Sequence, residues 1–125
     1  MASEEVILQK LEGFDTKTAV AAMAGKVSLY LMIIKKFVGM YAEDMPEKIE
    51  ALLAANDLES LRREAHTIKG LAGSIGHPGL QSAALALENA AKAEAPADEL
   101  NAASTTFLNT LAEVIAKIQA ALAEA

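Results

Sequence analysis

The sequence predicts an all-α protein, an antiparallel up-and-down four-helix bundle with an additional short N-terminal helix. Apolar residues recur at three- and four-residue spacing along most of the chain, and no segment alternates like a strand for more than a few residues. Short turns separate the periodic segments, which is typical of antiparallel neighbours in a bundle. The 125 residues are 53% hydrophobic, and much of that share is alanine, so one domain with closely packed helices is expected.

The N-terminal part is predicted to hold a leader and a short helix. Residues 1–14 show no clear periodicity, and we interpret them as a leader or linker before a domain that spans 15–125. At the start of this domain Asp15 is placed to cap a short helix, and Gly25 is placed to end it.

Four longer helical segments follow, at about 28–55, 57–75, 79–94 and 98–123. Pro46 marks either a kink in the first of them or the first turn of a separate helix. Asp57 and Asp98 are placed as N-caps of the second and the fourth. The expected core positions of the four segments, in order, are Leu29, Ile33, Phe37 and Met40; Leu61, Ala65, Ile68, Ala72 and Ile75; Leu80, Ala84, Leu87 and Ala91; and Leu100, Ala103, Phe107, Leu111, Val114 and Ile118.

Composition excludes several classes of function. The net charge of −6 argues against nucleic acid as the main partner, because binding to phosphates needs clustered positive charge. The absence of cysteine excludes disulfides and cysteine metal sites. No apolar run reaches the roughly 18 residues of a membrane span, and the first residues do not resemble a signal peptide. We therefore expect a cytoplasmic protein or module without a membrane span.

The stretch AHTIKGLAGSIG, residues 65–76, places three glycines beside one of the two histidines. Each glycine inside a helix costs roughly 1 kcal/mol relative to alanine. On a helical wheel His66 lies about 140° from Leu61 and thus points away from the core stripe. Gly70 and Gly73 lie on the same side as His66. Their missing side chains are expected to give a partner close access to the imidazole.

Other chemistries are less well supported by the residues. His77 lies 11 residues after His66, about 16 Å further along even an unbroken helix, so the two histidines cannot share a metal ion. A haem bundle is disfavoured because His66 points outward and the methionines fit core positions. No acid–base set for hydrolysis is apparent, and the spaced glycines follow no strand, as a nucleotide-binding loop would. His77 lies in the turn GHPG and is best interpreted as structural.

The same stretch resembles the signature of histidine-containing phosphotransfer (HPt) domains of two-component phosphorelays. The matching residues are a histidine, a lysine three positions later and then glycines and small residues: His66, Lys69, Gly70, Ala72, Gly73 and Gly76. The similarity extends over roughly residues 15–95. It implies a four-helix bundle that carries a phosphoryl group and is not an enzyme by itself. By resemblance, His66 is the phosphorylation site at Nε2, Lys69 is the cation beside the phosphoryl group, and Gly70 lets the partner dock.

The resemblance also suggests a residue that holds the histidine ring. Some members place a glutamate or glutamine 22 positions after the histidine, and here that residue is Glu88. The wheel places Glu88 at the edge of its helix's core stripe, about 80° from Leu80, from which a side chain can reach a neighbouring helix. Lys92, one turn later, is a candidate for a further basic contact. A carboxylate on Nδ1 would fix the ring tautomer and free Nε2 for attack.

The expected partner is the receiver domain of a response regulator or of a hybrid histidine kinase. Arg62, Arg63 and Lys69 form a basic cluster around His66 that would meet an acidic receiver pocket. We expect no cofactor or metal on this chain, since the resemblance implies that Mg²⁺ belongs to the receiver. Two alternatives stay open: the N-terminal phosphotransfer domain of a chemotaxis-type histidine kinase, and a helical-bundle adaptor whose histidine is not phosphorylated.

Overall fold

The structure is a computed structural model that describes residues 4–123, and within that range it contains seven α-helices and no strand. The helices are α1 (Glu4–Gln9), α2 (Thr16–Ala22), α3 (Val27–Tyr41), α4 (Met45–Ala54), α5 (Leu58–Ile75), α6 (Pro78–Lys92) and α7 (Ala97–Ala123). The all-α prediction is confirmed for this range. Residues 1–3 of the predicted leader and 124–125 of the predicted domain lie outside the described residues.

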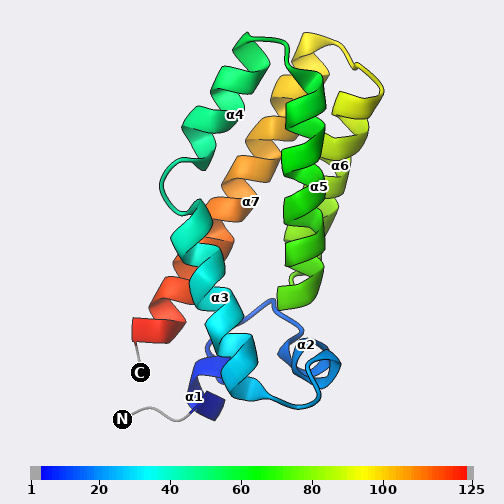
Figure 1. The fold of residues 1–125 in the computed structure, drawn as a ribbon. Coiled ribbons are helices and arrows are strands. Elements are labelled where there is room, and N and C mark those ends of the chain that lie inside the picture. The colour runs from blue at the N-terminus through cyan, green and yellow to red at the C-terminus, as the bar shows by residue number, and fades with distance from the viewer. Residues whose placement is uncertain (1–3, 124–125) are drawn as a thin grey trace.

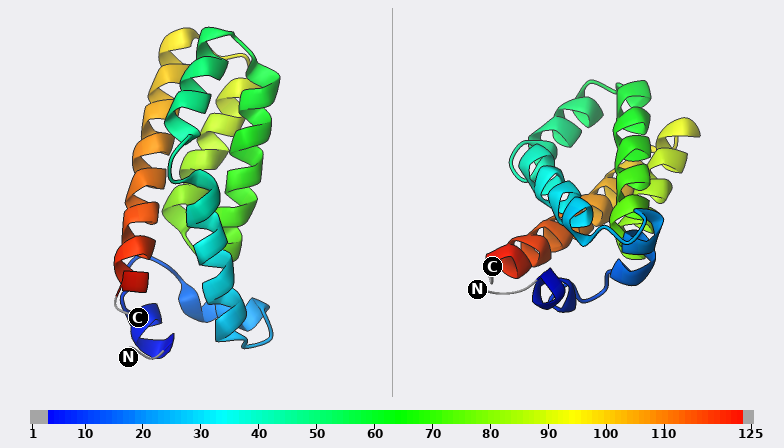
Figure 2. Two further views of the ribbon diagram at one scale, coloured as in Figure 1. Left: turned by 60° about the vertical axis from the view of Figure 1, so that its left-hand side comes forward. Right: turned by 60° about the horizontal axis from the view of Figure 1, so that its bottom comes forward.

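The helices form an up-and-down bundle with four columns (Figure 1). The first column is α3 continued by α4, and α5, α6 and α7 then alternate in direction. Figure 2 shows from a second side that α5 and α6 run next to each other. The short helices α1 and α2 lie at the end of the bundle where α7 ends (Figures 1 and 2).

The first column is broken into two helices. α3 ends at Tyr41, and Pro46 lies in the first turn of α4. Of the two interpretations of this proline, the first turn of a separate helix is therefore confirmed. The predicted core position of Met40 is wrong, since its relative exposure is 65%. Because most residues of α3 are apolar, its periodicity does not single out one face. The side chains of α3 that are in fact buried are Tyr30, Leu31, Ile34, Phe37 and Tyr41.

The predicted core stripes of α5 and α6 are confirmed, since every residue named for them is buried. Asp57 caps α5 as expected, with its carboxylate accepting from the Ser60 N–H at 3.2 Å. The predicted N-cap at Asp98 is wrong. α7 begins at Ala97, so Asp98 lies within the first helical turn, where its negative charge still favours the helix.

The N-terminal segment belongs to the same core. Ile7 of α1 and Leu11 just after it are 5% and 3% exposed. Asp15 caps α2 by accepting from the Thr18 N–H at 3.1 Å. The far end of α5 is held by Tyr30 of α3, whose hydroxyl donates to the Ile75 carbonyl at 2.7 Å. Burial raises the pKa of Tyr30 to about 12, so this hydroxyl stays a donor at ordinary pH.

Candidate functional site

His66 lies on the outward face of α5. The opposite face of this helix is buried against the rest of the bundle, and Ala65 and Ile68 on either side of His66 are fully buried. The His66 side chain itself is 62% exposed. The rigid helix therefore presents the imidazole to solvent from a fixed backbone position.

Glu88 of α6 holds the His66 ring. Its residue is only 8% exposed, and its Oε2 accepts a hydrogen bond from His66 Nδ1 at 2.6 Å. The contact expected between these two residues is thus present. An ionised carboxylate can only accept, so Nδ1 carries a proton, and in the neutral ring Nε2 then keeps the free lone pair. Among residues 4–123, Nε2 of His66 makes no hydrogen bond and is available to an incoming group.

Lys69 shares the same carboxylate. Its Nζ donates to the other oxygen of Glu88, Oε1, at 2.6 Å. The hydrogen bond from Lys69 is the main reason why the pKa of Glu88 lies below its usual value; burial opposes this shift and the bond to His66 adds to it. Glu88 therefore stays ionised at neutral pH, although it is almost fully enclosed. One buried carboxylate orders two side chains that stand one helical turn apart on α5.

The two glycines beside His66 have different surroundings. An added Cβ at Gly70 would meet nothing within 4 Å, apart from its own helix, so this position faces open space. At Gly73 an added Cβ would lie 2.9 Å from Gln81 Nε2. The space above Gly73 is thus occupied by the end of a flexible side chain of α6, which would have to shift to admit a larger residue. Sequence reasoning missed Gln81, because nothing in its own spacing marks it.

The basic residues near the site are partly paired. Arg62 contacts Glu59 at 2.7 Å, and Arg63 lies 3.6 Å from the same carboxylate. Lys92 is exposed in the last turn of α6 and, with Arg62, lines a cavity of about 270 Å³ between the two helices. The cluster around His66 therefore includes an acidic residue, and its excess of positive charge is smaller than the arginines alone suggest.

An apolar cavity that sequence reasoning missed is lined by residues of α3 and α5. Its volume is about 260 Å³, and it is lined by Ile33, Lys36, Phe37, Met40, Leu71 and Ser74. Ser74 follows Gly70 by one helical turn, so the cavity adjoins the outward face that carries His66. The sequence pattern predicts Met40 as a core residue, so it gives no sign that an apolar surface is exposed here.

Neither a metal cluster nor a straight membrane helix occurs in the part of the chain that the structure describes. No group of three or more histidine, cysteine, aspartate or glutamate side chains there could hold a metal ion. Within residues 4–123 no single helix is long and apolar enough to cross a membrane. α2 and α3 pass this test only as a pair, with a bend of 109° between them.

Comparison with known proteins assigns the family. A search of curated proteins and a search of solved structures found no significant match. The family model for the Hpt domain matches residues 36–121, which is more than half of the chain and includes α4 to α6 completely and most of α7. This family acts in phosphotransfer within phosphorelay signalling, and its members carry phosphoryl groups to and from receiver domains. The chain therefore belongs to the Hpt domain family.

Proposed function

We propose that His66 accepts a phosphoryl group from a receiver aspartate or a histidine kinase and passes it to the receiver domain of a response regulator. The observation that supports this most strongly is the shared carboxylate of Glu88, which accepts from both His66 Nδ1 and Lys69 Nζ. A merely exposed histidine would need neither a buried carboxylate on its ring nor a lysine held beside it.

The chemistry follows from the tautomer that Glu88 fixes. Nε2 of His66 attacks the phosphorus of an aspartyl phosphate; the P–N bond forms as the P–O bond to the aspartate breaks, and the carboxylate leaves. The Nδ1 proton stays on the ring, where Glu88 offsets the positive charge that develops. In the return step a receiver aspartate attacks the same phosphorus, and Nε2 leaves with its lone pair. No proton has to leave the ring in either direction.

Lys69 supplies the positive charge for the phosphoryl oxygens. It stands three residues after His66 on the same helix, and its ammonium is already held near the ring through Glu88. A cation fixed before the reaction stabilises the charge on the transferring group without further reorganisation. We place the Mg²⁺ of this reaction in the acidic pocket of the receiver rather than on this chain.

The partner surface is proposed to extend from His66 over Gly70 to the apolar cavity lined by Met40 and Leu71. The open position at Gly70 allows close backbone approach, and the apolar side chains provide area for a helix of the receiver. Arg62 and Lys92 lie on the other side of His66, toward the end of α6, where they can meet acidic residues of the partner.

A transfer assay tests this function. The protein is incubated with a panel of phosphorylated receiver domains, and acid-labile phosphate on the chain is then measured at neutral pH. We expect labelling of the wild type and of His77→Asn, which keeps a side chain able to cap α6, and no labelling of His66→Gln. Labelling of His66→Gln at the wild-type level, or no labelling of the wild type by any receiver or kinase, would contradict the proposal.

A further inference from the structure

The N-terminal segment is attached to the turn between α5 and α6. The Asp15 N–H donates to the Gly76 carbonyl at 2.6 Å. Gly76 has a φ of +80°, and a Cβ at this position would lie 2.6 Å from the Asp15 carbonyl oxygen. Only glycine fits both the left-handed backbone and this close approach. The start of α2 is therefore fixed directly to the turn that follows α5.

His77 links this contact to the beginning of α6. Its Nδ1 accepts a hydrogen bond from the Leu80 N–H at 2.9 Å and so caps the helix. The other side of the ring meets the Phe14 ring edge-on, with 4.8 Å between the centroids and 70° between the planes. A single imidazole thus contacts both the N-terminal segment and the first turn of α6, and the cap requires that Nδ1 be unprotonated.

The surroundings of His77, burial above all, disfavour its protonated form. Lys117 of α7 donates to the Glu12 carbonyl at 3.1 Å, and a Cβ at Gly13 would lie 3.4 Å from Lys117 Nζ and 3.9 Å from His77 Nε2. Burial and then Lys117 lower the pKa of His77, while Glu113 of α7 acts in the opposite direction.

Asp15 is a further charged group on this side, since it lines the same cavity as His77. The hydrogen bonds that it accepts from Thr18 keep the pKa of Asp15 below its ordinary value. Asp15 is therefore ionised throughout the range in which a histidine titrates.

We propose that His77 is a protonation-sensitive latch that holds α2 against the end of the bundle and releases it when the ring gains a proton. A proton on Nδ1 would remove the acceptor of the Leu80 N–H. The resulting cation would also face Lys117 and the positive end of the α6 dipole. Both effects weaken the turn to which Asp15 is attached.

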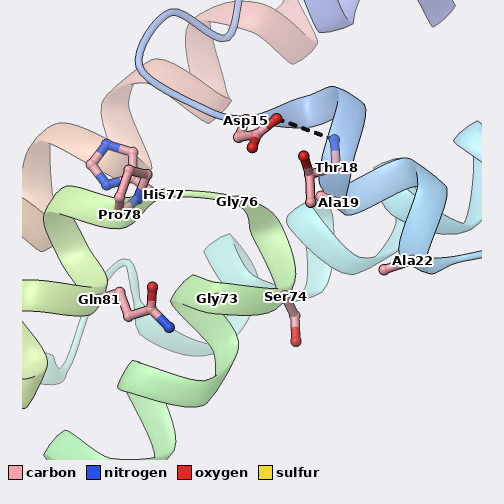
Figure 3. Close-up of a pocket in the computed structure, with 10 residues that line it drawn as sticks. All are labelled: Asp15, Thr18, Ala19, Ala22, Gly73, Ser74, Gly76, His77, Pro78 and Gln81. Carbon is pink, nitrogen blue, oxygen red and sulfur yellow. Dashed lines mark hydrogen bonds between the residues drawn. The ribbon is translucent and has the colours of Figure 1, made fainter.

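The release of α2 would change the surface near the transfer site. α2 forms one wall of a cavity of about 220 Å³ whose other walls come from α5 and α6 (Figure 3). Gly73 and Gln81 line this cavity, and Gly73 lies on the same side of α5 as His66. The latch therefore connects the protonation of His77 to the shape of the surface around Gly73, about two helical turns after His66 on α5.

Amide hydrogen exchange tests the latch on the full chain. Protection factors, corrected for the intrinsic exchange rate, are measured for residues 16–22 at about pH 7.5 and about pH 5, on either side of the ordinary histidine pKa. We expect protection of α2 in the wild type to fall by about tenfold or more at the lower pH. His77→Asn keeps a capping oxygen but cannot titrate, so its α2 should show no such fall. His66→Gln removes the other histidine and should respond like the wild type.

Two results would overturn the latch. One is unchanged protection of α2 in the wild type across this pH range, and the other is a pH response in His77→Asn equal to that of the wild type. If His77→Asn does not fold, NMR titration of the wild type decides instead. The midpoint of the loss of α2 protection must then coincide with the titration of the His77 ring, and coincidence with any other group rejects the proposal.

Discussion

Gly70→Gln is predicted to stabilise the protein and at the same time to impair transfer. Gly70 is exposed in the middle of α5, and an added Cβ would meet nothing within 4 Å beyond its own helix. Replacing a helical glycine by a better helix former gains about 0.5–1 kcal/mol, because glycine loses more backbone entropy on folding. For a domain of this size that gain raises Tm by about 2–5 °C.

The effect of Gly70→Gln on transfer has the opposite sign. The new side chain would stand one helical turn from His66 on the face that the partner must approach. Reacting atoms have to come within about 3–3.5 Å of each other, and a displacement of about 1 Å can cost a hundredfold in rate. We therefore expect phosphotransfer between receiver and His66 to slow by about 10–100-fold.

The matched control is Gly39→Gln. Gly39 lies in α3, is also exposed, and likewise has no neighbour within 4 Å of an added Cβ. It should show a similar gain in Tm and is the control for stability alone, because it adjoins Met40 of the proposed partner surface. Thermal unfolding and rapid-quench transfer kinetics on the two variants decide the matter. If Gly70→Gln unfolds the bundle, the glycine serves packing; if it transfers phosphate as fast as the wild type, the access argument is wrong.

Three further predictions follow from the same structure. Glu88→Gln should slow transfer by about tenfold or more while circular dichroism stays helical, because the amide cannot offset the charge on His66; an unchanged rate would contradict this role. Ser104→Ala should raise the free energy of unfolding by about 1 kcal/mol in urea titrations, because the buried Ser104 hydroxyl has no hydrogen-bond partner among residues 4–123. The pKa of Asp57 is lowered by the hydrogen bonds from Ser60, so its cap contributes stability above the unfolded pKa of 3.8 and loses it as the pH falls through the lower folded value. Asp57→Asn should flatten this acid limb in unfolding titrations.

The outward position of His66 could be predicted from the sequence because α5 has a single apolar face. Leu61, Ala65 and Ile68 leave no other side of this helix for the core. The buried face of α3 was harder to predict, since apolar residues occupy several faces of this helix and Met40 is one of them. The polar and apolar faces of α5 are clearly separated in the sequence and those of α3 are not. The buried face was therefore predicted correctly for α5 and only in part for α3.

The contact between Glu88 and His66 was within reach of sequence reasoning, but the way in which Lys69 shares that carboxylate was not. It depends on how closely α5 and α6 approach each other, and both helices bury small residues such as Ala72 and Ala84. The attachment of Asp15 to Gly76 was equally inaccessible, because it joins backbone atoms far apart in the chain and leaves no periodic trace.

The His66–Glu88–Lys69 arrangement has a consequence for how this protein can be altered. All three side chains, together with Gly70 and Gln81, belong to one helical hairpin of residues 58–92. The other helices pack against the apolar side of this hairpin. Such core positions accept many apolar substitutions if volume and patterning are kept. The reactive unit is thus transplantable in principle: a designed bundle that reproduces the spacing between α5 and α6 should acquire the ordered imidazole without copying α3, α4 or α7.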